Sequence, residues 1–357
     1  MEKKSSMEKM VKNNFFENKK ILITGNTGFL GSWLTLFLLS KKSKIFGISN
    51  SCNKKSLFKL LNLKNKINHF NFDLKDKTKV KKFFKNKNID IVIHLAAEPL
   101  VYKSFKFPRE TIENNFLTTI NLLNEFKSSK SKLFVNFTTD KVYKNLNKKK
   151  MYYQENSELF GSDPYSFSKS CSDMAVKMWS ENIGNISLKY INVRCGNIIG
   201  GSDWSKKRIV TDINNSLFKS QNLILRNPNS TRPWIHVFEV CNYLLELIRN
   251  NEKIKHNFSA WNIAPNKKDN KSVKWLAKKF LRLHSNKIKK IRLKKSDFKE
   301  NLYLNIDNSK IKKFIKKDFL FKIDQRIYLT YEWYKYFFFN KKELNKYSLK
   351  QVDKFIF

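Results

Sequence analysis

The chain has 357 residues, of which 41% are hydrophobic, and its formal net charge is +42. This length and hydrophobic content predict a folded protein with one large or two smaller domains, and they exclude a disordered chain. The longest apolar run, residues 29–40, is too short to cross a bilayer, so no membrane partner is expected. Residues 1–19 are charged and polar and lack the apolar segment of a signal peptide, which indicates an N-terminal extension and a cytoplasmic location.

The high positive charge has two interpretations. It is typical of nucleic-acid-binding proteins, but here lysine is spread over almost every segment and arginine is scarce. Drift toward AT-rich codons explains this pattern better than a nucleic-acid-binding surface, which would gather basic and aromatic residues on one face. We therefore expect no nucleic-acid partner. A basic, NAD-responsive nucleic-acid-binding protein without turnover remains a remote alternative.

Cysteine and histidine give no sign of a metal site. The four cysteines lie far apart and form no CxxC pair, so reduced thiols are expected. The five histidines do not cluster with carboxylates or cysteines. The sequence therefore predicts no bound metal.

The first 200 residues alternate between strand and helix patterns. A strand, a glycine turn and a buried helix are predicted in KKILITGNTGFLGSWLTLFLLSKK. Further strands are predicted in KIFGIS, INHFNFDLKD, IDIVIHLAAEP, KLFVNFTTD and SLKYINVRCGNIIG, with a helix in TIENNFLTTINLLNEFKSS and a loop at 144–150. Such alternation predicts an α/β fold, a doubly wound parallel Rossmann sheet with helices on both faces.

After residue 200 the pattern changes. GGSDWSKKRIV and LRNPNSTRPWIHV are rich in turn formers and polar residues, which favours a smaller substrate-binding lobe, mainly C-terminal. We expect an extension at 1–19, a nucleotide-binding domain at 20–200 to which part of 234–260 returns, and a lobe made largely of 201–357. TYEWYKYFFF predicts a final aromatic-rich helix.

The glycine turn is a candidate dinucleotide site. Gly25, Gly28 and Gly31 form GxxGxxG between the first strand and the first helix, where glycine lets the backbone approach a pyrophosphate and the helix N-terminus attracts it. The second strand ends in ISNS, without an acidic residue for the adenine ribose, so the choice between NAD and NADP stays open. Asp73 is placed to contact the adenine, and residues 95–97 (Leu95, Ala96 and Ala97) to line the cofactor.

Two further motifs are candidates for catalysis. Tyr165 and Lys169 form YxxxK, which on a helix places both side chains on one face, where an ammonium favours tyrosinate and thus a base. In TTDKVY, Asp140 and Lys141 follow Thr139 at the end of a predicted strand. This dipeptide is either a solvated surface turn, which is common in a lysine-rich chain, or a paired acid and base.

Taken together, these motifs resemble an extended short-chain dehydrogenase/reductase of the NAD-dependent epimerase/dehydratase family. Within it, the CDP-glucose 4,6-dehydratase branch is the most similar, from about Lys20 to the C-terminal helix. The likeness rests on TGNTGFLGSWL, HLAAEPLVYKSF, TTDKVY, DPYSFSKSCSDMA, GNIIGGSDW, LRNPNSTRPWIHV, AWNIAP and LNIDNSK. An Asp-Lys pair is typical of this branch, whereas dTDP-glucose and GDP-mannose dehydratases carry Asp-Glu and epimerases lack such a pair.

The resemblance implies a hydro-lyase (lyase) reaction on CDP-glucose that yields CDP-4-dehydro-6-deoxy-D-glucose and water for deoxysugar and polysaccharide biosynthesis. Tyr165 would take the C4 hydroxyl proton as hydride passes to NAD, Thr139 would bind the same oxygen, and Lys169 would hold the nicotinamide ribose. Lys141 would then remove the C5 proton and Asp140 would protonate the departing C6 hydroxyl, before hydride returns to C6.

The resemblance also implies binding residues and an assembly. The implied cofactor contacts are Gly25, Thr27, Gly28, Phe29, Leu30, Gly31, Asp73, Leu95, Ala96, Ala97, Tyr165 and Lys169. The implied substrate contacts are Asn197 and Arg208 at the diphosphate and Arg232 at the nucleotide end. Helices at about 110–127 and 165–182 would pair with their copies in a homodimer or higher homo-oligomer.

The chain departs from the branch at a few positions. Asn26 and Leu30 replace a His and a Lys of the glycine loop, which bears on cofactor affinity more than on reaction type. Near residue 299, KEN replaces HEA, so Glu300 is left out of the predicted site although it aligns with an acidic position. Another nucleotide-sugar dehydratase or an epimerase of the same fold is the alternative function.

Overall fold

The computed structural model describes residues 15–185, 187–219, 221–284, 291–294 and 300–356. Residues 1–14 of the expected N-terminal extension lie outside this range. Within it, Phe16 is buried against the core, and its carbonyl accepts a hydrogen bond from Ser43 Oγ at 2.9 Å.

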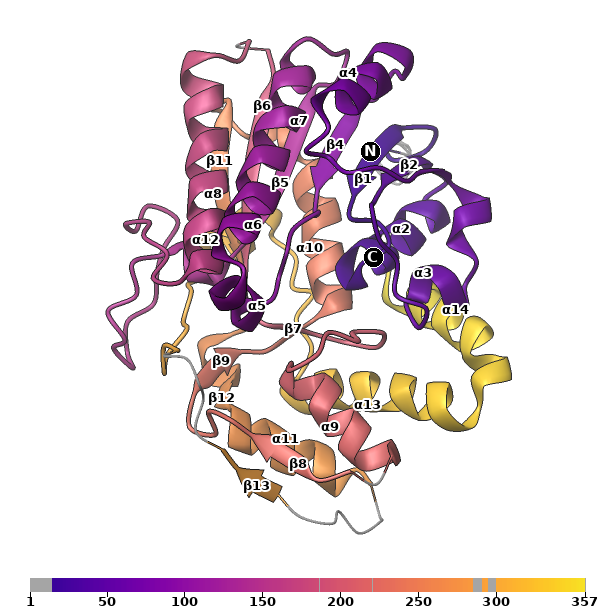
Figure 1. The fold of residues 1–357 in the computed structure, drawn as a ribbon, viewed down its shortest axis with the longest axis vertical. Helices are drawn as coiled ribbons and strands as arrows, with labels where there is room; N and C mark the ends of the chain where they lie inside the picture. The colour runs from indigo at the N-terminus through magenta and orange to yellow at the C-terminus, as the bar shows by residue number, and fades with distance from the viewer. Residues whose placement is uncertain (1–14, 186, 220, 285–290, 295–299, 357) are drawn as a thin grey trace, which may run out of the picture.

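A seven-stranded parallel sheet organises the larger part of the molecule, in the order β11-β6-β5-β4-β1-β2-β3 (Figure 1). Its strands are β1 (Lys20–Thr24), β2 (Lys44–Ile48), β3 (Asn68–Phe70), β4 (Ile91–His94), β5 (Leu133–Thr139), β6 (Lys189–Cys195) and β11 (Phe258–Ile263). The six strands predicted from the first 200 residues are confirmed, as is the doubly wound α/β class. The sequence did not reveal β11, because its short run FSAWNI becomes a strand by pairing in register with β6.

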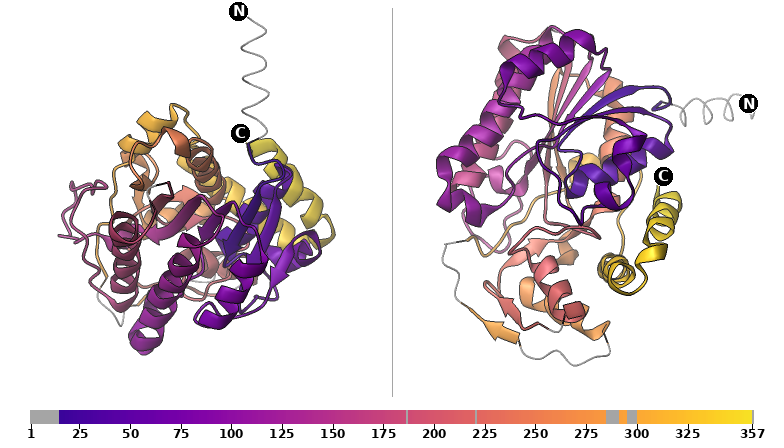
Figure 2. Two further views of the ribbon diagram at one scale, coloured as in Figure 1. Left: turned by 90° about the horizontal axis from the view of Figure 1, so that it is seen from above. Right: turned by 45° about the vertical axis from the view of Figure 1, so that its right-hand side comes forward.

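Alternating side chains divide the core between the two faces of the sheet. In β1, Ile21 and Ile23 join one hydrophobic cluster, while Leu22 between them joins the other. The first cluster packs beneath α2 (Phe29–Ser40), α10 (Val237–Arg249) and α14 (Leu344–Phe355). The second packs beneath α4 (Lys77–Asn86), α7 (Thr118–Lys127) and α8 (Pro164–Asn182), so helices cover both faces (Figure 2).

The predicted helix at 110–127 is built from three consecutive pieces. These are α6 (Pro108–Ile112), a π-helical turn η2 (Glu113–Leu117) and α7. Next to it, α8 begins after Asp163, whose side chain caps the helix by accepting a hydrogen bond from the Ser166 N–H at 2.9 Å. This cap fixes the first turns of α8, which carry the YxxxK motif.

A smaller lobe lies below the carboxyl ends of the strands (Figure 1). It holds α9 (Ile209–Lys219), α11 (Val273–Arg282), β8 (Leu223–Leu225), β9 (Thr231–Pro233), β12 (Asn270–Ser272) and β13 (Ile291–Leu293). Short strands β7 (Ile198–Ile199) and β10 (Ile235–His236) pair between the lobe and the sheet. The remaining elements are α3 (Leu57–Leu60), η1 (Leu63–Lys66), α5 (Val101–Lys106), η3 (Asp140–Val142), η4 (Asn251–Lys253), η5 (Lys267–Asp269), α12 (Ser309–Ile315) and η6 (Lys341–Glu343). The division of the chain at residue 200 stays a prediction.

The aromatic-rich tail forms α13 (Ile323–Phe339), as predicted, but it is not the final helix. The chain continues into α14, whose Leu344, Val352 and Phe355 are buried in the cluster beneath α2. The many polar and charged residues of this segment concealed its apolar face. Across the described ranges, no helix is both long and apolar enough to cross a membrane.

Candidate active site

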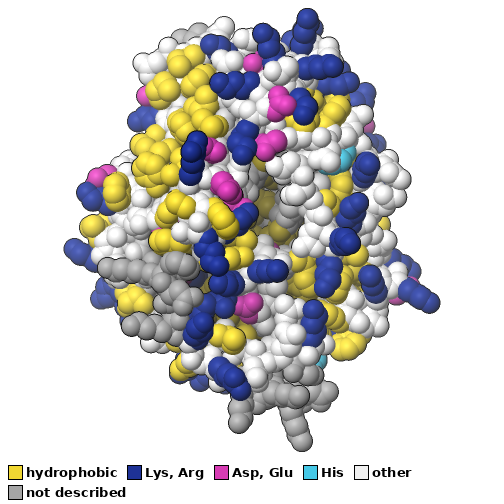
Figure 3. All heavy atoms as spheres, viewed as in Figure 1, with side chains coloured by type: hydrophobic (Ala, Val, Ile, Leu, Met, Phe, Trp, Pro, Cys, Tyr) yellow, Lys and Arg dark blue, Asp and Glu magenta, His cyan; other side chains and the backbone are white. Residues whose placement is uncertain are grey.

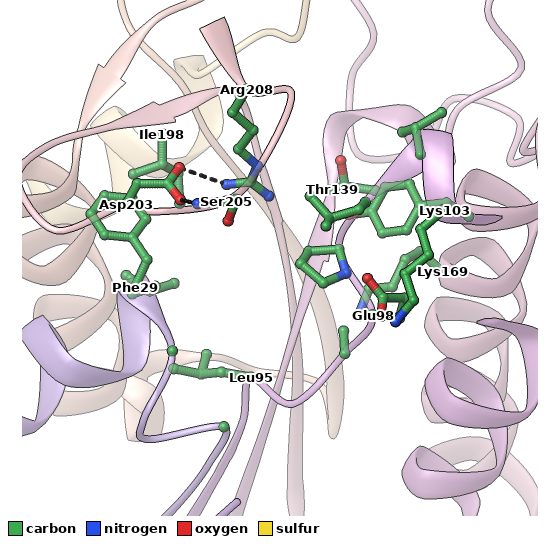
Figure 4. A pocket seen from close by; sticks show the side chains of 18 of the residues that line it. Phe29, Leu95, Glu98, Lys103, Thr139, Lys169, Ile198, Asp203, Ser205 and Arg208 are labelled. Carbon is green, nitrogen blue, oxygen red and sulfur yellow. Dashed lines mark hydrogen bonds and ion pairs between the residues drawn. The ribbon is translucent and has the colours of Figure 1, made fainter. Parts of the chain in front are cut away.

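A cleft of about 780 Å³ lies between the sheet and the smaller lobe, and Figure 3 shows a hollow near the centre of this face, with Lys and Arg side chains around it. Every residue predicted from the sequence to bind cofactor or substrate, or to take part in catalysis, lines this one cleft. In Figure 4, Phe29, Ile198, Asp203 and Arg208 lie on one side of it, and Glu98, Thr139 and Lys169 on the other. The structure therefore brings segments from residue 25 to residue 300 to one place.

The glycine turn has a shape that requires glycine. Gly25 has a φ of +72°, and a Cβ there would lie 2.8 Å from the backbone N of Ala96. A Cβ on Gly31 would lie 2.2 Å from the Gly25 carbonyl oxygen. Gly28 caps α2 without a side-chain hydrogen bond, which leaves this helix N-terminus facing the cleft. The turn thus fits a pyrophosphate group held by backbone N–H groups and the helix dipole.

The side of the cleft next to β2 is polar but carries no carboxylate at the strand end. Ser49 Oγ donates to Asn26 Oδ1 at 2.9 Å, and Thr27 Oγ1 donates to the Ser51 carbonyl at 2.6 Å. Asn26 is fully buried and also contacts His69 Nδ1 at 3.2 Å. Asn26 therefore packs as part of the turn.

The Asp-Lys dipeptide lies at the end of β5, where η3 begins. Asp140 is only 5% exposed, its Oδ1 accepts a hydrogen bond from Thr139 Oγ1 at 3.0 Å, and its Oδ2 has no hydrogen-bond partner among the described residues. Burial raises the pKa of the Asp140 carboxyl, although Lys141, Thr139 and Arg232 oppose the rise. Lys141 is half-buried and lines the cleft. These positions exclude the solvated surface turn that the composition allowed.

The YxxxK pair lies on the first turns of α8. Lys169 is 3% exposed, and its Nζ donates to the Phe137 carbonyl at 2.8 Å. Burial lowers the pKa of Lys169 to about 8, while Asp173 acts in the opposite direction. Desolvation raises the pKa of Tyr165 to about 12, and the cation that opposes this rise most is Arg208. The sequence had pointed to Lys169 in that role.

The predicted substrate residues come from the lobe side of the cleft. Asn197 is half-buried and directly precedes β7, and its backbone carbonyl accepts a hydrogen bond from the Ile235 N–H at 3.1 Å. Arg208 pairs with the buried Asp203 at 3.1 Å, and Asp203 also accepts from the Ser205 N–H, as Figure 4 shows. Both Asn197 and Arg208 face the same space as Tyr165.

Arg232 is buried and directs its guanidinium toward residues 300–302. Its Nη1 donates to the carbonyls of Thr231, Asn301 and Leu302 at 2.9, 3.0 and 3.3 Å, and its Nη2 pairs with Glu300 Oε2 at 3.1 Å. Arg232 thus fixes the segment that carries Glu300 as well as lining the cleft.

Three acidic side chains that line the cleft, Glu98, Asp203 and Glu300, were not predicted from the sequence. Glu300 and Asp203 each hold a predicted arginine, and Glu98 pairs with Lys103 above the cofactor side. Asp203 lies inside the quoted GGSDW motif and Glu300 at the acidic position of KEN, so a residue-level signal existed for both. Each forms an ion pair with a residue that is distant in the chain or lies in a loop, and local sequence spacing does not predict such pairs.

Comparisons with known proteins give the family of the chain. The family described as GDP-mannose 4,6 dehydratase matches residues 22–316. The chain belongs to this family. The chain is 34% identical over 283 residues to a CDP-glucose 4,6-dehydratase of Salmonella typhimurium. The match covers 77% of this chain and 79% of that relative. The family and fold expected from the sequence are thereby confirmed.

A second sequence relative and a solved structure are also similar to this chain. A dTDP-D-glucose 4,6-dehydratase of Dictyostelium discoideum is 32% identical over 251 residues, which is 66% of this chain and 56% of that protein. The solved structure of a dTDP-glucose 4,6-dehydratase from Bacillus anthracis in complex with NAD superposes with a TM-score of 0.75 at 21% identity, covering 89% of this chain and 96% of that one. This superposition supports the fold.

No group of three or more His, Cys, Asp or Glu side chains in the described part of this dehydratase-family chain is arranged to hold a metal ion. The polar groups that line the cleft include Tyr165, several lysines and arginines, and the carboxylates of Asp140 and Glu300, which suit an acid–base and anion-binding site.

Proposed function

We propose that the chain is an NAD-dependent CDP-glucose 4,6-dehydratase. The observation that carries this proposal is the Asp140–Lys141 pair at the end of β5. Asp140 is buried, Lys141 is half-buried, and both lie in one cleft with Tyr165 and the glycine turn. An epimerase of this fold needs the tyrosine and the cofactor but no second acid–base pair. The 34% identical CDP-glucose 4,6-dehydratase supports the choice of nucleotide.

The glycine turn and its surroundings would hold NAD. The backbone of Gly25, Gly28 and Gly31 fits the pyrophosphate, and Leu95 and Ala96 line the cleft beyond it. NAD supplies an acceptor that takes a hydride from the sugar and returns it. Asp73 lines the adenine end, where its side chain accepts from the Lys75 N–H at 2.9 Å. Whether NADP is also accepted stays open, since the end of β2 presents serine and asparagine only.

The first chemical task falls to Tyr165. Its phenolate would accept the proton of the C4 hydroxyl, while Thr139 orients that oxygen from the end of β5. Because desolvation holds the pKa of Tyr165 near 12, the tyrosinate needs positive charge nearby. Arg208 already provides some of it, and Lys169 would hold the ribose next to the reacting ring.

The second task falls to the Asp-Lys pair. Once C4 is a ketone, the C5 hydrogen is acidic and Lys141 would remove it as a proton. The C6–O bond then breaks, and Asp140 would give its proton to the departing hydroxyl so that water leaves. Burial favours the protonated form of Asp140, and its unpartnered Oδ2 is free to face a substrate oxygen. Hydride return to C6 and a proton to C5 complete the 4-keto-6-deoxy sugar.

A panel of nucleotide sugars tests this function. The full chain with NAD should turn over CDP-glucose to a 4-keto-6-deoxy product in preference to dTDP-glucose, UDP-glucose and GDP-mannose, as detected by carbonyl absorbance and mass spectrometry. A strong preference for dTDP-glucose or GDP-mannose would reassign the substrate and leave the fold untouched. Inversion at C4 without loss of water would make the chain an epimerase.

We also propose a homodimer through α8 and the α6–α7 helix. Phe167, Met174 and Met178 form one stripe on α8 with exposures of 45%, 45% and 42%, and Leu117 of η2 is 42% exposed. In Figure 3 hydrophobic side chains gather over these helices at the upper left. An exposed apolar stripe of this kind favours burial against a copy of itself. Light scattering of the wild type and of Met174→Lys tests it, since the lysine should yield monomers.

The cytoplasmic location stays a prediction.

A further inference from the structure

Residues 203–208, which we name the strap, connect β7 to α9, and residues 203 and 205–208 line the cleft. The base of the strap is Asp203, which is 3% exposed and accepts from the Ser205 N–H at 3.0 Å and from Arg208 Nη1 at 3.1 Å. The backbone carbonyl of Asp203 accepts from the Tyr334 hydroxyl at 2.6 Å. The base of the strap is therefore fixed to α13.

The strap also contacts two segments that follow strands of the large sheet. Lys207 Nζ lies 4.5 Å from the centroid of the Tyr102 ring, which belongs to α5 after β4. The Trp204 ring lies 5.5 Å from Lys55 Nζ, which belongs to the loop after β2. Both contacts are of the cation–π type. Two side chains of the strap thus reach two different parts of the nucleotide-binding sheet.

The order of the strands places the glycine turn between these two contacts. β1 lies between β4 and β2, and all three strands are parallel, so the segments that follow them leave the same edge of the sheet. A strap that contacts the segments after β4 and β2 therefore spans the opening in front of the turn after β1. The chain just before the strap approaches this turn too, since a Cβ on Gly200 would lie 3.2 Å from Phe29 Cζ. Figure 4 shows Phe29 and Asp203 on the same side of the cleft.

The contacts on the sheet side are easier to break than those at the base. Within the described residues, the hydrogen bonds and the ion pair of the strap stay inside it or run to α9 and α13, and none reaches α5 or the loop after β2. Ser202 and Lys207 have φ values of +71° and +61°, so the backbone turns sharply next to the base and again at the contact with Tyr102. The strap can therefore leave the sheet side without losing a hydrogen bond.

We propose that the strap closes over the NAD site and that the Lys207–Tyr102 contact is the latch that holds it closed, so that NAD binds and leaves only when the strap opens. Tyr102 is then a positioning residue, because it acts on NAD through the strap. This inference rests on the cofactor site of the proposed function and is independent of the sugar substrate. Closure of a loop over a ligand commonly limits the rate of its release.

The competing role is a direct one, in which Lys207 or Tyr102 contacts NAD itself. The two roles predict different kinetics. Loss of a latch leaves the strap open for more of the time, so NAD should bind and leave faster by similar factors and its Kd should change little. Loss of a direct contact should speed release alone and raise the Kd in proportion.

Tyr102→Leu and Lys207→Met test the latch, because each removes one side of the contact. The full chain is loaded with radiolabelled NAD and chased with an excess of unlabelled NAD, and we expect release to be about two- to fivefold faster than in the wild type. Rapid filtration with radiolabelled NAD should show association accelerated by a similar factor. Tyr102→Phe keeps the ring beneath the amine and should retain the rates of the wild type.

Two further variants complete the test. Tyr152→Leu is the matched control, because Lys267 Nζ lies 4.7 Å from the Tyr152 ring centroid in a similar contact that does not line the cleft. It should leave both rates of NAD exchange unchanged. The double variant Tyr102→Leu with Lys207→Met should release NAD no faster than either single variant, since both changes break the same contact.

Three results overturn the inference: unchanged release of NAD in Tyr102→Leu and Lys207→Met, faster release without faster association, or additive effects in the double variant. If the wild type binds no NAD, the cofactor site is wrong and the latch falls with it. If the wild type binds NAD but acts on no nucleotide hexose, the proposed function fails, and the rates of NAD exchange still decide for or against the latch.

Discussion

The two halves of the cleft are constructed in different ways. The cofactor half is mostly backbone: the turn Gly25–Gly31 and α2 follow one another along the chain, and their shape depends on glycine. The substrate half is mostly side chains: Asp203 holds Arg208 within one loop, and Glu300 holds Arg232 from a distant segment. We therefore expect the first half to tolerate replacement of its side chains, whereas a single lost charge should alter the chemistry of the second.

Tyr165 stands where the halves meet, so its loss should have the largest effect. Tyr165→Phe keeps the ring and removes the proton acceptor for the C4 hydroxyl, and we expect turnover to fall by about 10²–10⁴-fold. Binding of NAD should persist, because the glycine turn is untouched. The measurement is single-turnover formation of reduced nicotinamide with CDP-glucose, with Tyr328→Phe at an exposed tyrosine of α13 as the matched control. Near-normal oxidation by Tyr165→Phe would remove this residue from the mechanism.

Lys141 tests the substrate half by itself. Lys141→Met keeps much of the stem and removes the amine, so oxidation at C4 should continue while elimination falls by about 10²–10⁴-fold. Turnover in deuterated water measures both steps, because the wild type should carry deuterium at C5 and the variant should not. Lys144→Met, three residues on and exposed, is the matched control. If Lys141→Met forms product at an undiminished rate with normal deuterium labelling at C5, Lys141 is not the base.

Gly31 tests the cofactor half. In Gly31→Ala the new Cβ would lie 2.2 Å from the Gly25 carbonyl oxygen, so the backbone of the turn must shift. Overpacking of this kind costs about 1–3 kcal/mol, and we expect NAD to bind about 10- to 100-fold more weakly. Titration of NAD by calorimetry measures this. Gly28→Ala should lose less, since its Cβ would meet a single atom at 3.2 Å, and equal affinities in both variants and the wild type would contradict the model of a backbone-built half.

This contrast also explains what the sequence could predict. The glycine turn, the YxxxK pair and TTDKVY are each contiguous, so local spacing identified them, and the six strands of the first 200 residues were visible as apolar runs. The partners of Arg208 and Arg232 were not predicted. Asp203 and Arg208 are close in the chain but lie in a loop, where no regular spacing pairs them, and an ion pair between residues 232 and 300 leaves no local pattern. β11 and α14 were missed for the same physical reason: each becomes regular structure through packing on the sheet or on α2, and neither has a strong local signal.

The smallest expected effect is on the free energy of unfolding, which should depend on pH. His94, beneath the cofactor half, is 1% exposed and bridges Thr24 Oγ1 and Thr119 Oγ1 at 2.7 and 3.1 Å. Burial, assisted by Lys169, lowers the pKa of His94 to about 3, whereas an unfolded histidine titrates near 6.5.

Between these two values the unfolded chain binds the additional proton. Stability is therefore full above about pH 6.5 and is lost as the pH falls toward 3, by about 1.4 kcal/mol per pH unit for each such group. His236, which burial also holds neutral with a pKa of about 3, should add a similar slope. Urea unfolding of the wild type at pH 7.5, 6.0 and 5.0 should show this loss, and His94→Gln should reduce its slope, whereas His256→Gln at an exposed site should not. If His94→Gln loses stability in acid as steeply as the wild type, the acid sensitivity originates elsewhere, and the carboxylates of the substrate half, Glu300 above all, become the groups to replace next.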